Sequence, residues 1–131
     1  MRVLAPARLL ALLVGTAAAA LPGLPDPLAA GWQGKPVCEK LHEDQLQRIL
    51  RCTFPPGVGH ERHYHSAHFG YALAGGQVRI TDQGGTRDVT FETGSTSVSR
   101  GIAWHEIVNI GESTIVYLLV EPKPPSAQAG R

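Results

Sequence analysis

The feature that most constrains the fold of this chain is the regular alternation of short strand-like segments with turn-forming residues. Residues 77–81 alternate apolar and polar side chains, as strands with one buried face do. Clusters rich in Gly, Pro and Ser separate such segments. We expect nine strands, over residues 37–41, 45–54, 62–65, 69–74, 77–82, 86–91, 96–99, 105–110 and 114–121.

This pattern predicts an all-β domain. No window beyond the first thirty residues has a convincing helical period, and many short strands at this spacing indicate a closed sandwich or barrel. A chain of 131 residues has room for one compact domain once a leader is removed. We expect that domain over residues 31–123, followed by a Pro-, Ala- and Gln-rich flexible tail over 124–131.

The first thirty residues have the composition of an export signal. Arg2 and Arg8 form a positively charged start, and an apolar stretch follows. Small residues offer cleavage after Ala20 or near Ala30. The apolar stretch is shorter than the roughly 20 residues that a membrane span needs, and three prolines follow it. We therefore expect a signal peptide over residues 1–30, a periplasmic or secreted protein, and no stable membrane span.

Charge and cysteine content narrow the classes of partner and compartment. The formal net charge is +1 and the basic residues are scattered, so the sequence lacks the charged patch that nucleic acid or an anionic membrane requires. Cys38 and Cys52 are the two cysteines, and an oxidising compartment allows them to pair. Two separate buried thiols are the alternative.

Five of the six histidines fall in two places: four lie within residues 60–68, and the fifth is His105. Because alternate side chains of a strand share a face, His63 and His65 project side by side. His105 begins a later strand and can approach them from across the barrel. Imidazole suits Fe, Ni, Cu or Zn better than Mg or Ca, and the candidate ions are Fe, Mn, Ni, Cu and Zn. The histidines predict a divalent transition metal site, with ordinary hydrogen-bonded histidines as the alternative.

The spacing of these residues resembles the two motifs of the cupin superfamily. Gly57, five residues, and the run 63–65, followed by the run 71–75, resemble the first motif. Gly94, ten residues, His105, three residues and Asn109 resemble the second. The resemblance covers about residues 45–123 and is strongest to small single-domain cupins, or monocupins.

The resemblance implies a cupin-type antiparallel β-barrel, also called a double-stranded β-helix or jelly roll. It also implies that His63, His65 and His105 are metal ligands. The first motif normally supplies a Glu as fourth ligand, and the corresponding position, counted back from Gly75, is His68. Since cupins with four histidines occur, we expect a metal site of His63, His65, His68 and His105. The alternative for His68 is a turn residue that faces solvent.

Other residues beside the motifs have weaker signals. Glu61 shares strand parity with His63, so it is an additional ligand, a general base, or a charge exposed at the rim. The aromatic residues near the motifs are expected in the core or in the wall of a pocket; they are Phe69, Tyr71, Phe91 and Trp104.

The resemblance leaves the activity open, because this fold hosts many unrelated functions. Our leading hypothesis is an exported, metal-dependent enzyme acting on a small organic molecule, with a dioxygenase-like oxygenase as its most specific form. The catalytic residues are not assigned. The alternative is a non-catalytic periplasmic module that binds a small metabolite or a metal. We expect a small-molecule ligand or substrate and a homodimer.

Overall fold

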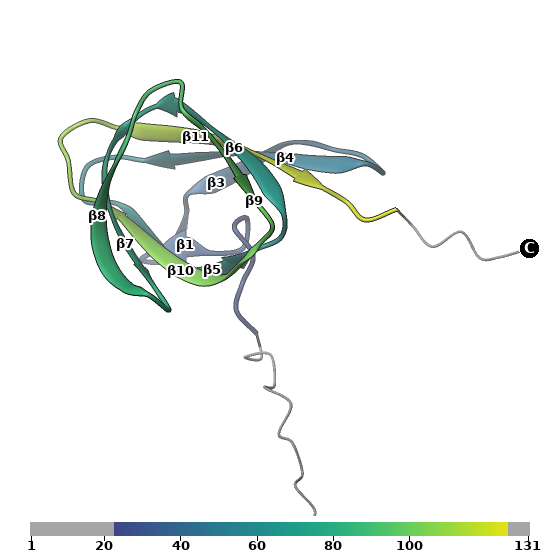
Figure 1. Ribbon diagram of the computed structural model, residues 1–131, viewed down its shortest axis with the longest axis horizontal. Coiled ribbons are helices and arrows are strands. Elements are labelled where there is room, and N and C mark those ends of the chain that lie inside the picture. Colours follow the sequence, from purple (N-terminus) through teal and green to yellow (C-terminus); the bar gives the residue numbers. More distant parts are fainter. Residues whose placement is uncertain (1–22, 126–131) are drawn as a thin grey trace, which may run out of the picture.

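The computed structural model describes residues 23–125, in which every regular element is a strand. No helix in this range is long and apolar enough to cross a membrane. The strands, shown in Figure 1, are β1 (Gly31–Trp32), β2 (Lys35–Pro36), β3 (Cys38–Glu43), β4 (Gln47–Phe54), β5 (Gly59–His65), β6 (His68–Ala74), β7 (Gly76–Asp82), β8 (Gly85–Phe91), β9 (Thr96–Ser99), β10 (Ile102–Asn109) and β11 (Ile115–Pro122).

Two antiparallel sheets form the barrel. One has the strand order β5-β10-β7-β8 and the other β3-β4-β11-β6-β9. In Figure 1, β4, β6 and β11 lie along the top of the barrel, β5 and β10 lie below them, and β7 and β8 form the left side. Strands β3 to β11 correspond to the nine predicted segments, so the prediction of an all-β antiparallel barrel is confirmed. The two-residue strands β1 and β2 were too short for a pattern to reveal.

The apolar core lies between the sheets, on the inward-facing positions of β4, β7 and β11. Alternation along β4 buries Leu50, Cys52 and Phe54 and leaves Arg51 and Thr53 exposed. Val78, Ile80, Ile115 and Leu119 complete the buried cluster from the other two strands. Burial of these side chains provides the main stabilisation of the barrel.

The two cysteines form a disulfide between adjacent strands. Cys38 of β3 is directly opposite Cys52 of β4, and both side chains are buried. The sequence was compatible with either a disulfide or two separate thiols, and the structure contains the disulfide. It fastens β3, an edge strand, to the rest of its sheet.

The outer face of the five-stranded sheet is unexpectedly apolar. Ile49, Val120, Phe69 and Val98 stand in one row across β4, β11, β6 and β9. Phe69 is 40% exposed and Val98 is 85% exposed. The expectation that Phe69 and Tyr71 lie in the core or a pocket wall is wrong, because the small residues that alternate with them face inward on β6.

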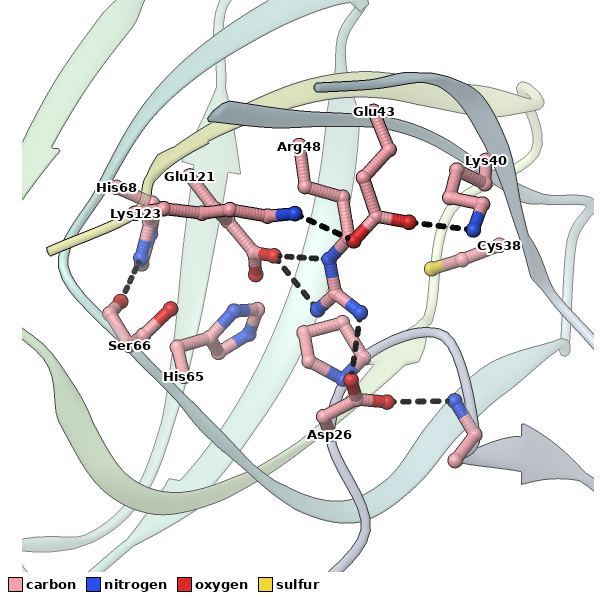
Figure 2. A network of polar contacts seen from close by, with 12 residues as sticks. Asp26, Cys38, Lys40, Glu43, Arg48, His65, Ser66, His68, Glu121 and Lys123 are labelled. Carbon is pink, nitrogen blue, oxygen red and sulfur yellow. Dashed lines mark hydrogen bonds and ion pairs between the residues drawn. The ribbon is translucent and has the colours of Figure 1, made fainter. Parts of the chain in front are cut away.

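The segment before β1 is packed against the barrel. The carbonyl oxygen of Pro25 accepts a hydrogen bond from the Tyr64 amide at 3.1 Å, and Pro27 is fully buried. Figure 2 shows Arg48 between Asp26 and the buried Glu121, with its guanidinium donating to Asp26 at 2.7 Å. The predicted leader up to residue 22, and the tail from residue 126, lie outside the described residues.

Candidate metal centre

Three buried imidazoles converge on the inner face of the four-stranded sheet. His63 and His65 project from β5, as the alternation of a strand requires, and His105 lies opposite His63 on β10. The Nε2 atom of His65 is 2.9 Å from that of His63 and 2.9 Å from that of His105. The Nε2 atoms of His105 and His63 are 3.1 Å apart. The structure therefore brings together three of the four predicted ligands.

The spacing of these nitrogens fits a transition-metal ion. Two imidazole nitrogens bound at right angles, each at about 2.1 Å, would lie about 3.0 Å from each other. Nδ1 of His63 donates to the Glu61 carbonyl at 2.6 Å, so its Nε2 carries the lone pair that a metal requires. Convergent lone pairs repel one another unless a cation lies between them. The nitrogen donor set suits Fe, Co, Ni, Cu or Zn.

Burial keeps the cluster uncharged near neutral pH. Removal from water, together with the neighbouring imidazoles, lowers the pKa of His65 to about 2 and that of His105 to about 3. Burial also lowers the pKa of His63, although the Glu61 carbonyl opposes this change. Neutral imidazole is the form that binds metal, so the site needs little deprotonation before it can accept an ion.

A fourth imidazole, that of His60, supports the cluster from behind. Its ring lies 3.7 Å from the ring of His63, centroid to centroid, and its Nε2 lies 3.0 Å from the Pro27 carbonyl oxygen. Sequence parity does not predict this position, because His60 and His63 are three residues apart yet both face inward. The register of β5 against β10 shifts between them, which is the effect of a β-bulge.

The same register shift decides the position of Glu61. Its side chain is exposed, and its Oε1 accepts a hydrogen bond from the Gln33 amide at 2.9 Å. Of the three interpretations of Glu61, the structure agrees with the exposed charge. The carboxylate does not join the three convergent imidazoles in the part of the chain that the structure describes.

His68 lines the cavity but stands apart from the three convergent nitrogens. It begins β6, is only 8% exposed, and its ring lies 4.7 Å from that of His65. The alternative of a solvent-facing turn residue is therefore wrong. Among residues 23–125, the group of ligand atoms within 4.8 Å of one another comprises His63, His65 and His105 alone. The role of His68 as a fourth ligand stays a prediction.

The cluster forms part of the wall of a cavity of about 310 Å³. Most of the remaining wall is apolar, and Phe91 belongs to it as expected. Two charged residues that the sequence analysis did not single out, Asp82 and Arg87, also line this cavity. Strand alternation could have identified both residues, because it puts them on the same face as a buried residue. Asp82 lies two residues after the buried Ile80, and Arg87 is the cross-strand partner of Ile80.

Asn109, the last residue of the second motif, has a structural role. It is 1% exposed, and its side-chain amide donates to the carbonyl oxygens of Phe54 and Ser113, each at 2.8 Å. Its side-chain oxygen accepts from the Gly111 amide at 2.9 Å. These contacts fix the turn between β10 and β11, and Asn109 does not line the cavity.

Comparison with solved structures identifies the fold. A cupin domain from Bordetella pertussis is 17% identical, with a TM-score of 0.64 over 78% of this chain and 100% of that one. A Klebsiella pneumoniae protein with a double-stranded β-helix domain is 15% identical, with a TM-score of 0.55 over 72% and 82%. A cupin superfamily protein from Desulfitobacterium hafniense is 14% identical, with a TM-score of 0.52 over 66% and 76%.

These likenesses show that the chain has the cupin fold, as the sequence motifs implied. Comparison of the sequence with protein-family models found no match, and comparison with curated proteins found no significant match. The function must therefore be argued from the site itself.

Proposed function

We propose that this chain, which has the cupin fold, is an exported enzyme that acts on a small organic molecule at a divalent metal ion held by His63, His65 and His105. The observation that carries the proposal is the convergence of three buried Nε2 atoms, separated by 2.9 to 3.1 Å, at the wall of a cavity. When bound, such an ion supplies a Lewis acid and, if it is redox-active, electron transfer.

The protein's own residues prepare the site for a small molecule. The apolar wall, which includes Phe54, Phe91 and Ile107, gives an organic substrate a surface to contact. Nδ1 of His68 is held by the Ser66 carbonyl at 2.9 Å, which leaves Nε2 as the nitrogen that can bind the ion or exchange a proton.

Polar groups beside the cluster favour an enzyme over the alternative of a non-catalytic binding module. Asp82 is the cross-strand partner of His105, and His68 adjoins His65. A module that only captures an apolar metabolite has no need of ionisable groups so close to the ion. Identification of the native metal tests the oxygenase form of the proposal. Zinc would exclude an oxygenase, because it is not redox-active, whereas iron or copper would permit one.

Metal content tests the site directly. Wild-type protein should copurify with about one equivalent of a transition metal, measured by elemental analysis, and His63→Ala or His105→Ala should lose most of it. His42→Ala is the matched control, since His42 is exposed and paired with Asp44 on the other sheet. Full metal content in either cluster variant would overturn the proposed site. Circular dichroism must show that each variant keeps its β structure.

Export is supported by the disulfide between Cys38 and Cys52 as well as by the composition of the first thirty residues. Such bonds form and persist in oxidising compartments such as the periplasm. We place the mature N-terminus at or before Gly23, because the segment that follows it is packed into the barrel. Cleavage near Ala30 would remove the buried Pro27 and the hydrogen bond from His60 to its carbonyl.

A second copy of the chain is the occupant that we propose for the apolar outer face of the five-stranded sheet. The row from Ile49 to Val98 has no charged member. The flanking Arg51 is already paired with Glu39. The face is therefore electrically neutral, and two copies can stack without bringing like charges together.

Sedimentation analysis tests this dimer. Wild-type protein should sediment as a dimer, and Phe69→Glu should shift it to a monomer. Tyr64→Glu is the control, since Tyr64 is 42% exposed on the opposite sheet. A monomeric wild-type protein, or an equal effect of both substitutions, would contradict the proposal.

A further inference from the structure

An ion pair occupies the inner face of the β7–β8 hairpin, beside the metal cluster. The Arg87 guanidinium lies 2.9 Å from the Asp82 carboxylate, and both residues line the cavity. Arg87 is directly opposite Ile80, whose side chain is buried in the cavity wall. A charged side chain at such an inward-facing position is unusual, because its neighbours on that face are apolar.

The pair lies close to the metal cluster. Asp82 of β7 is the cross-strand partner of His105 on β10, and Arg87 is one strand further along the same sheet. Adjacent strands are about 4.8 Å apart, and Arg87 lies two residues along β8 from the position level with His105, so their backbones are roughly 12 Å apart. A molecule of a few atoms' length in the cavity can therefore contact the ion and the guanidinium together.

The β7–β8 hairpin already has a cross-strand ion pair besides the one between Arg87 and Asp82. On its outer face, Arg79 already forms a two-point ion pair with Asp88, with distances of 2.8 and 3.0 Å. Within residues 23–125, Arg87 pairs with Asp82 alone, and its side chain is 52% exposed. Its remaining N–H donors are available at the cavity, and a guanidinium fork matches the two oxygens of a carboxylate.

We propose that Arg87 is the anchor for the carboxylate of the substrate, and that the substrate is a small organic acid with a compact apolar body. The body contacts Ile80 and Phe91, and its far end reaches the cluster of His63, His65 and His105. Asp82, which also accepts a hydrogen bond from the Gly84 amide at 2.8 Å, holds Arg87 at the cavity. This assignment rests on the proposed function and specifies its substrate class.

The opposing explanation is that an inward-pointing charge protects β8, an edge strand, from pairing with other chains. The two explanations predict different measurements. An anchor decides the affinity for anions, whereas edge protection affects aggregation and leaves ligand binding unchanged.

Calorimetric titration with benzoate and with its neutral counterpart benzamide separates them. Wild-type protein should bind benzoate, and Arg87→Gln should weaken that binding by about tenfold or more while leaving any benzamide binding unchanged. Arg79→Gln, which breaks the outer pair of the same hairpin, should leave benzoate affinity unaltered. Arg87→Lys keeps the charge but loses the fork, so its affinity should be intermediate and its folding undisturbed.

Three results would overturn the anchor. The first is no benzoate binding by the wild type, and the second is an Arg87→Gln affinity equal to that of the wild type. The third is a loss of affinity in Arg79→Gln equal to that in Arg87→Gln. Aggregation of Arg87→Gln, with Arg87→Lys binding as the wild type does, supports edge protection instead. Metal content is measured on the same samples. If the wild type holds no metal but its benzoate affinity still depends on Arg87, the proposed metal function fails and the anchor stands.

Discussion

The Nδ1 atom of His68 lies 2.9 Å from the backbone carbonyl oxygen of Ser66, two residues earlier in the chain. A carbonyl accepts only, so Nδ1 carries the proton and Nε2 carries the lone pair. Metal-bound histidines are commonly held in this way, with one nitrogen donating to a carbonyl and the other ligating. Figure 2 shows this contact beside His65.

We therefore expect His68→Ala to weaken metal binding by about ten- to a hundredfold. His68→Glu should retain the ion, because a carboxylate replaces the lost donor. Competition with a chelator of known affinity measures both effects. Phe69→Ala, in the next position but on the outer face, is the control. Unaltered affinity in His68→Ala would leave a site of three histidines.

The buried ion pair of Arg48 should dominate the electrostatic contribution to stability. Arg48→Ala would leave Glu121, which is 4% exposed, charged and without its partner. We expect a loss of about 3 kcal/mol in the free energy of unfolding, measured in urea. Arg51→Ala, on the same strand, breaks an exposed pair with Glu39 and should cost less than about 1 kcal/mol. Equal effects of the two substitutions would contradict this account.

Asp26 should make part of the stability depend on pH. Burial alone would raise the pKa of its carboxyl, but the Ala29 amide and Arg48 outweigh burial and hold the pKa below 3.8. A folded-state pKa below the unfolded one stabilises the fold above the unfolded pKa, and the contribution disappears as the pH falls through the folded one. Asp26→Asn should thus be less stable than wild type at pH 7, and the difference should shrink below about pH 4. A difference that stays constant to pH 2 would rule this out.

Loss of the disulfide should destabilise the whole barrel. The bond closes a loop between residues 14 positions apart, and a loop of this length corresponds to about 3 kcal/mol. Cys38→Ser with Cys52→Ser should therefore unfold at a lower urea concentration than wild type. Reduction of the wild type should reproduce that shift and leave the double variant unaffected. Wild-type protein that is insensitive to reductant would count against the prediction.

The mature N-terminus should lie at or before Gly23. Mass spectrometry of protein recovered from its native compartment should show a chain that begins near Leu21 and retains Pro25 and Pro27. A mature chain that begins at Gly31 would contradict the contribution of these residues to the fold. A soluble full-length chain that begins at Met1 would contradict export itself.

Local sequence patterns were sufficient to predict most of the barrel and the centre of the site. Turn residues determined the nine strands, because Gly and Pro limit where a strand can continue. Strand alternation put His63 and His65 together, since a two-residue period holds wherever the strand is regular. The contribution of His105 depended on the motif spacing, because local patterns do not report which distant strands are adjacent.

The remaining features depend on irregularity and on tertiary contacts. The register shift in β5 brought His60 inward and Glu61 outward, and nothing in the sequence marks the additional residue. Alternation alone did not reveal which side of β6 faces the core. The large aromatic side chains of Phe69 and Tyr71 made their side look like the buried one, but the small residues that alternate with them face inward. Asp82 and Arg87 had the correct parity, but a charged residue on a strand ordinarily faces solvent.

The position of β11 has a consequence for how the chain folds. It is the last strand within residues 23–125 and lies between β4 and β6, so the five-stranded sheet consists of two separate pairs, β3-β4 and β6-β9, until β11 joins them. Its pairing with β4 closes a long stretch of chain, from Phe54 to Ile115, which makes it a slow contact. A nascent chain leaving the ribosome cannot complete the five-stranded sheet before β11 has been synthesised. If the chain is exported as we propose, this delay would favour its passage through a translocation channel before the barrel closes.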